Sequence, residues 1–191
     1  LGQGGALFEL DDKRKLFNLL NTLTRREEAY HDKLAAALAP GEETPGGSKS
    51  IHDIVLAKEK GLAERLCYDW YRRSALIDHF LADGVTLEDF SRCSYVELGD
   101  FVNQPYDADY NKTGRDRLEL ILFRSGSIWQ GTQPFPIRLE KRISITAGET
   151  EFPIHYVITN LSPTPLSVRF GVEFGFALQA GDTFDRYYII P

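Results

Sequence analysis

Residues Cys67–Leu81, CYDWYRRSALIDHFL, hold the side chains of this sequence that are best suited to chemistry. Asp78 and His79 stand side by side there. A carboxylate and an imidazole can act as general acid and base when a third group and a nucleophile or water lie within hydrogen-bonding reach. Adjacent residues of a strand point to opposite faces, so these two cannot easily form a dyad with each other. We therefore expect a structural polar cluster, with one of the pair hydrogen-bonded to a neighbouring arginine, that ties the N-terminal part of the chain to a sheet. Its members are Arg72, Arg73, Asp78 and His79.

Three aromatic residues are candidates for carbohydrate binding, because the apolar face of a glucose ring stacks on Trp and Tyr rings. They are Trp70, Tyr71 and Trp129. Packing in a core or at a domain interface is the commoner role of such rings and stays open as an alternative. Glycosidase chemistry needs two carboxylates that flank the scissile bond. No acidic residue of this sequence stands in a motif that singles it out, so we predict no catalytic residue in the chain.

The sequence YDADYN resembles the start of a calcium-binding loop through Asp107, Asp109 and Asn111. Such a loop requires Gly at its sixth position and Glu at its twelfth. This sequence has Lys112 and Leu118 there. We therefore expect a solvated turn and predict neither a metal site nor a cofactor.

The composition limits the cellular compartment and the classes of binding partner that the sequence suggests. Cys67 and Cys93 are too few for a disulfide framework, and neither has a second Cys or His at zinc-ligand spacing, which favours a reducing, cytoplasmic setting. The net charge of −6 argues against non-specific nucleic-acid binding, which needs clustered Lys and Arg. No apolar run approaches the roughly 18 residues of a transmembrane helix, so no membrane partner is predicted.

The second half of the chain predicts long β-strands in which apolar residues alternate with polar ones. A Ser-Gly-Ser turn is expected at residues 125–127, between apolar flanks. Strands joined by AGETE and LSPTP predict an antiparallel meander, and long strands with a polar second face suit a large sandwich. The alternating segments are 118–129, 137–148, 152–161 and 166–181.

The first half predicts shorter elements. Residues 27–39 are the clearest helix, with acidic residues in the first turn and a Pro-Gly stop after the last. Residues 40–50, PGEETPGGSKS, predict a mobile loop. Capping-box spacing predicts short helices after Ser50 and after Thr86. The apolar run at residues 16–24 suits either a strand or a helix.

Four motifs together resemble a known family, in their order and spacing. They are GGALFELD at Gly4–Asp11, FNLLNTLTRREEAYH at Phe17–His31, SIHDI with the nearby YDWYRRSALIDHF, and ELGDF at Glu97–Phe101. They resemble the C-terminal, non-catalytic domain of family-57 glycoside hydrolases, the α-amylase and 4-α-glucanotransferase group. The resemblance covers nearly the whole chain. It implies a mainly β fold, a large antiparallel β-sandwich of the galactose-mutarotase-like supersandwich type, with a few short helices in the N-terminal half.

The sequence contains no methionine, even at position 1, so we expect Leu1 to be internal to a longer protein. At the other end, Tyr187–Ile190 reads as a strand with further partners downstream. We therefore expect residues 1–191 to be a single, truncated C-terminal sandwich domain.

The resemblance implies an accessory region that supports the catalytic barrel of the same polypeptide and binds α-1,4-glucan or a maltooligosaccharide. The catalytic carboxylates of the family lie in that barrel, and none can be carried over to this sequence. The alternative is a free-standing sugar-active enzyme on a mutarotase-like fold, with Asp78, His79 or His155 as the acid/base. The missing start methionine and the lack of paired histidines favour the accessory region.

Overall fold

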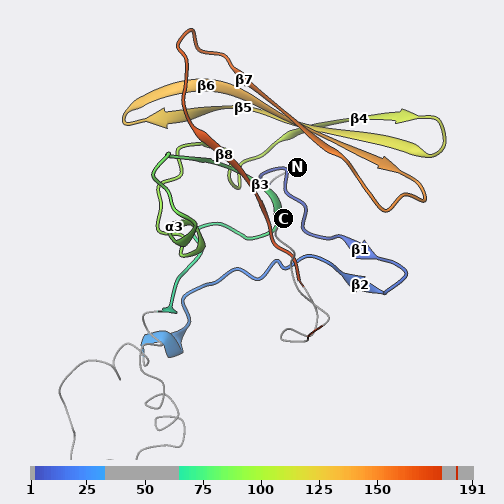
Figure 1. Ribbon diagram of the computed structural model, residues 1–191, viewed down its shortest axis with the longest axis horizontal. Coiled ribbons are helices and arrows are strands. Elements are labelled where there is room, and N and C mark those ends of the chain that lie inside the picture. The colour runs from blue at the N-terminus through green and yellow to red at the C-terminus, as the bar shows by residue number, and fades with distance from the viewer. Residues whose placement is uncertain (1–2, 33–64, 178–183, 185–191) are drawn as a thin grey trace, which may run out of the picture.

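The computed structural model describes residues 3–32, 65–177 and 184. Two antiparallel sheets face each other, which confirms the predicted mainly β sandwich (Figure 1). The larger sheet follows chain order and contains β4 (Asp107–Thr113), β5 (Arg117–Gln130), β6 (Gln133–Thr146) and β7 (Ile154–Asn160). The smaller sheet pairs β3 (Ala75–Leu81) with β8 (Arg169–Phe174). A short hairpin consists of β1 (Asp11–Asp12) and β2 (Phe17–Asn18).

The hairpin of β5 and β6 is the centre of the larger sheet, and the two strands pair along their whole length. The Ser-Gly-Ser turn predicted at residues 125–127 is wrong, because β5 continues through it. Gly126 does not turn the chain; it allows neighbouring residues to approach the strand closely. A Cβ at this position would lie 2.8 Å from Cζ of Phe101. The neighbouring Ser127 N–H donates to Oδ1 of Asp100 at 2.9 Å, so the segment before β4 packs directly on the strand.

The connection from β7 to β8 crosses from the larger sheet to the smaller one. The meander expected across LSPTP therefore ends at β7, and β8 pairs with β3 instead, from Ala75 opposite Phe174 to Leu81 opposite Arg169. The alternation predicted for this segment holds from Leu166 to Val172, whose apolar members pack on the core, but Phe174 and Phe176 are exposed. Alternation identifies the buried face of a strand but not its neighbour, which explains the error.

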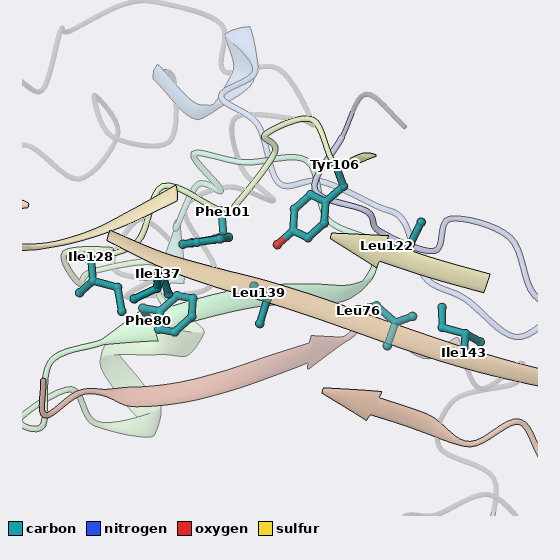
Figure 2. Packing of buried hydrophobic residues seen from close by; sticks show 9 residues of the cluster. All are labelled: Leu76, Phe80, Phe101, Tyr106, Leu122, Ile128, Ile137, Leu139 and Ile143. Carbon is teal, nitrogen blue, oxygen red and sulfur yellow. The ribbon is translucent and has the colours of Figure 1, made fainter. Parts of the chain in front are cut away.

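Apolar side chains from both sheets fill the space between them. All seven residues of β3 are buried, because this strand lies between the larger sheet on one side and α3 (Leu87–Ser91) with its flanking segments on the other. Figure 2 shows the central cluster of Leu76, Phe80, Phe101, Tyr106, Leu122, Ile128, Ile137, Leu139 and Ile143.

Helix α3 begins after the N-cap residue Thr86. The Thr86 side chain accepts from the backbone of Asp89, and the Asp89 side chain accepts from Thr86 N–H, so the predicted capping box is confirmed. The solvated turn expected at residues 107–111 is wrong. That segment belongs to β4, an edge strand whose residues are all exposed.

The N-terminal segment is attached to the smaller sheet. Leu7 and Ala75 exchange two backbone hydrogen bonds of 2.8 Å each. The run at residues 16–24 contributes only the two residues of β2 to a strand.

Several predicted elements fall partly or wholly outside the described residues. Residues 29–32 are helical and belong to the predicted helix 27–39. The remainder of that helix, the loop at 40–50, the helix after Ser50 and the strand Tyr187–Ile190 lie outside them. Within the described residues, no helix has the length and apolar character needed to cross a membrane.

Candidate functional site

His79 lies on the face of β3 that points away from the larger sheet, between two carboxylates. Its Nδ1 is 2.8 Å from Oε2 of Glu97, and its Nε2 is 3.3 Å from Oε2 of Glu173. The side chain is only 1% exposed. Rings of Tyr71 and Phe90 meet the imidazole edge-on at centroid distances of 5.3 and 5.1 Å. Both ring nitrogens are thus engaged inside an aromatic enclosure.

Glu173, on β8, is the hub of this outer polar cluster, which comprises His79, Glu97, Glu173, Tyr71 and Arg73. The Tyr71 hydroxyl donates to Oε2 at 2.7 Å, and Nη2 of Arg73 lies 3.0 Å from Oε1. Burial raises the pKa of Glu173, but hydrogen bonds from His79, Tyr71 and Arg73 outweigh it and hold the pKa below 4.5. Burial lowers the pKa of His79, but its two carboxylates outweigh burial and raise it above 6.5.

Asp78 points the other way, into the space between the sheets, and forms the inner polar cluster with Lys141 of β6 and Tyr106. Its Oδ2 is 2.7 Å from Nζ of Lys141 and accepts from the Tyr106 hydroxyl at 2.7 Å. Both charged side chains are fully buried. Nζ of Lys141 also donates to the carbonyl oxygens of Leu76, Gly4 and Gly5 at 2.6 to 3.2 Å. Burial raises the pKa of Asp78 and lowers that of Lys141 against the attraction between them.

The predicted polar cluster of Arg72, Arg73, Asp78 and His79 is therefore divided between two faces of β3. Arg73 reaches His79 only through the shared Glu173, and Arg72 instead donates to Oε1 of Gln3 at 3.2 Å. Several hydrogen bonds form the expected connection between this segment and the N-terminal part of the chain. Besides the Arg72–Gln3 contact, the backbone N–H of Arg73 donates to Oγ1 of Thr24 at 3.0 Å.

The aromatic candidates differ in exposure. Tyr71 is 3% exposed and its hydroxyl is committed to Glu173, so its ring is not open to a sugar from solvent. Trp70 is 51% exposed and Trp129, near the end of β5, is 44% exposed. The structure brings no two of the three rings together on the surface, since Trp70 meets the buried Tyr71 edge-on at 4.8 Å.

Tyr68, two residues before Trp70 in the chain, and Tyr30 are also exposed aromatic residues. Tyr68 is 37% exposed and Tyr30 is 51% exposed, and both pack on His31 at centroid distances of 5.5 and 4.2 Å. Asp69, between Tyr68 and Trp70, is turned inward with a fully buried side chain. We call Tyr30, Tyr68 and Trp70 the surface aromatic row. In Figure 1 they belong to the blue helical turn at residues 29–32 and the teal segment before β3.

Asp78, His79 and His155, the three alternative acid/base candidates, lie in three different environments. His155 is an exposed residue of β7 opposite Arg142, whereas Asp78 and His79 lie on opposite faces of β3. A cavity of about 300 Å³ touches His79 and Glu173 beneath α3, but its wall is mostly apolar. The polar atoms of His79 and Glu173 already form hydrogen bonds with other groups of the protein. Their arrangement joins β3 to β8 and to Glu97.

The residues that complete the two clusters were not identified from the sequence. Lys141 stands at an inward position of the alternating run Ile137, Leu139, Lys141, Ile143, and a charge at such a position signals a buried partner. Glu97 and Glu173 carry no comparable local signal. In the described part of the chain, no group of three or more His, Cys, Asp or Glu side chains is arranged to hold a metal ion.

Comparison with known proteins identifies relatives of the chain along its whole length. Residues 1–191 match the family described as "Alpha-amylase/4-alpha-glucanotransferase, C-terminal". The chain is 36% identical over 177 residues to the 4-alpha-glucanotransferase of Thermococcus litoralis, covering 93% of this chain and 25% of that protein. It is 34% identical over 188 residues to Alpha-amylase 1 of Dictyoglomus thermophilum, covering 98% of this chain and 25% of that protein.

The crystal structure of 4-alpha-glucanotransferase from Thermococcus litoralis has a similar fold. It superposes with a TM-score of 0.69 at 33% sequence identity, over 92% of this chain and 24% of that one. The chain thus spans about a quarter of the length of these relatives. The resemblance seen in the four sequence motifs is confirmed, and the chain belongs to the C-terminal family of α-amylases and 4-α-glucanotransferases.

Proposed function

We propose that this chain is the accessory C-terminal β-sandwich region of a cytoplasmic glucan-processing enzyme. It supports the catalytic barrel of the same polypeptide and does not carry the chemistry itself. The observation that carries the proposal is the match to a C-terminal family over all 191 residues, which correspond to only a quarter of the relatives' length. The saturated hydrogen bonding of His79 is consistent with it, because both ring nitrogens already have carboxylate partners.

We further propose that the region binds α-1,4-glucan or maltooligosaccharide through the surface aromatic row. Half-exposed rings offer flat apolar faces for sugar rings to stack on. The Tyr68 hydroxyl lies 3.0 Å from Nδ1 of His31, which fixes the ring. Burial, followed by the negative charges of Glu27 and Asp32, raises the pKa of Tyr68. Carboxylates beside an aromatic face can accept hydrogen bonds from sugar hydroxyls. Trp129 remains a second candidate, and the buried Tyr71 is omitted.

The two tryptophans allow the two candidate surfaces to be tested separately, because the chain contains no others. Each single Trp→Phe variant leaves one tryptophan as the fluorescent reporter. With maltoheptaose at millimolar concentration, Trp129→Phe is expected to keep the wild-type fluorescence change, while Trp70→Phe loses most of it. Tyr68→Ala should weaken binding about tenfold, which corresponds to one stacked ring. The sugar should be recovered unchanged in length.

Tyr110→Ala is the matched control, since Tyr110 is an exposed tyrosine of β4 outside the row. A response that follows Trp129 instead would move the site to the end of β5. No fluorescence change in any protein would leave only the supporting role. Turnover of maltoheptaose that disappears in His79→Ala would contradict the proposal and favour the sugar-active enzyme.

A further inference from the structure

The two cysteines of the chain meet at one guanidinium. Nη1 of Arg25 donates to Sγ of Cys67 at 2.7 Å, and Nη2 of the same side chain lies 3.6 Å from Sγ of Cys93. The two Nη atoms are bonded to a single carbon, so both sulfurs lie against one guanidinium group although they come from segments on either side of β3. Both cysteines are free and partly exposed, which leaves them open to a small reagent.

The groups around the sulfurs make the two thiols chemically different. Cys93 donates its S–H to Oδ1 of Asp69 at 3.3 Å. Burial, followed by the interaction with Asp69, raises the pKa of Cys93 and keeps it a thiol. Cys67 has no carboxylate partner among the bonds described; its sulfur faces an N–H of the cation. The Cys67 sulfur therefore has a charged hydrogen-bond donor at 2.7 Å and no competing carboxylate, which favours it as the attacking sulfur.

The cluster is also well anchored. Arg25 forms an ion pair with Asp69, and its Nη1 donates to the carbonyl of Ser91 at 2.8 Å. The hydrogen bond to Asp69 is the largest of the influences that raise the pKa of Arg25, so the guanidinium stays charged. The positive charge beside the thiols is thus a fixed part of the structure.

We propose that Cys67 and Cys93 form a reversible dithiol–disulfide site that reacts with small-molecule disulfides. Cys67 loses its proton and its sulfur attacks one sulfur of the disulfide RSSR, forming a mixed disulfide and releasing one RS⁻. Cys93 then loses its proton and attacks the Cys67 sulfur, which releases the second RS⁻ and closes the protein disulfide. The protein gives up two electrons and two protons, and RSSR becomes two RSH. The new bond joins the segment before β3 to the residue that follows the cap of α3.

Oxidised glutathione is a suitable probe of the folded full chain. We expect the intact mass of the wild type to fall by two hydrogens, with no retained glutathione and no thiol reactive toward maleimide until a reductant is added. Cys93→Ser should retain one glutathione on Cys67. The adduct should form at least about tenfold faster than on Cys67→Ser, in which only the hydrogen-bonded thiol remains. The circular dichroism spectra of both serine variants control for folding.

Two results would overturn the site. One is a wild type that keeps both thiols free, and the other is a wild type that carries glutathione without an internal disulfide. Equal adduct rates in the two serine variants would overturn the role of Cys67 as the attacking thiol.

Discussion

At the scale of single residues, His79 joins β3 to two other parts of the fold. Glu97 follows α3 in the chain and Glu173 lies on β8, and each bonds one nitrogen of the ring. Glu97 also accepts from the backbone N–H groups of Phe80 at 2.7 Å and Gly99 at 3.2 Å, so three groups hold its carboxylate in place. The imidazole therefore acts as a cross-link, and its strength depends on pH because the pKa of His79 is raised by the two carboxylates against burial.

The pH range in which this cross-link stabilises the protein follows from the directions of two pKa shifts. The pKa of His79 is raised in the folded state, so its contribution is fully present below pH 6.5 and is lost as the pH rises through the folded value. The pKa of Glu173 is lowered, so its contribution is present above pH 4.5 and is lost as the pH falls through the folded value. The stabilisation from this pair is largest between these two limits.

His79→Gln should therefore lower the free energy of unfolding most at mildly acidic pH. We expect a loss of about 2–3 kcal/mol near pH 5.5, the cost of breaking a buried hydrogen-bonded network, and a smaller loss near pH 9. Urea unfolding at both pH values measures the difference. His155→Gln, on the exposed face of β7, should change neither value. A loss that is constant or larger at alkaline pH would show that His79 is neutral in the folded protein.

The sequence identified the important pair of this site but not its partners. Strand alternation correctly predicts that Asp78 and His79 serve different faces. It cannot predict that His79 meets Glu173, because the two residues are 94 positions apart and only the pairing of β3 with β8 brings them together. Lys141 could have been found, since a charge interrupts an otherwise apolar inward row.

At the scale of the elements, β5 depends on a glycine for its contact with the segment before β4. Gly126→Ala places a methyl group against the Phe101 ring and Asp100, so we expect a loss of about 1–3 kcal/mol from overpacking. The measurement is the midpoint of urea unfolding. Gly171→Ala on β8 is the matched control, because a Cβ there meets no atom within 4 Å. Equal losses in the two variants would show that the loss comes from replacing any strand glycine and not from the contact with Phe101 and Asp100.

The same position shows why part of the fold was not predictable. Gly flanked by two serines is a common turn sequence, and only the approach of Phe101 reveals that the small side chain is needed inside a strand. Elements whose signals are local were predicted correctly. The capping box of Thr86 and Asp89 is one example, and the alternation is another, in β6 as far as Ile143 and in β7 as far as Tyr156. The last members of the two predicted rows, Ile145 and Ile158, are exposed.

At the scale of the whole molecule, Lys141 connects the larger sheet, the smaller sheet and the N-terminal segment. Its ammonium group pairs with Asp78 of β3 and bonds the carbonyls of Gly4 and Gly5. Lys141→Met would leave the Asp78 carboxylate buried without its counter-charge. We expect a loss of about 3–5 kcal/mol in the free energy of unfolding.

The second substitution, Asp78→Asn in the Lys141→Met background, should recover much of this loss, because no uncompensated charge then remains buried. Urea unfolding of the single and double variants compares them directly. Lys112→Met on the exposed β4 is the control and should change stability by less than about 0.5 kcal/mol. A double variant no more stable than the single would show that the carbonyl contacts of Lys141, and not its charge pairing, carry the effect.

The pairing of β3 with β8 also determines when the fold can be completed during synthesis. His79 leaves the ribosome 94 residues before Glu173, which at 5–20 residues per second is roughly 5 to 19 s. The hairpins of β4 to β7 connect near neighbours in sequence and can form in that interval. β3 has no partner strand until β8 has been made. Through that interval the nascent chain presents a strand with an unpaired edge, and such an edge is open to incorrect pairing.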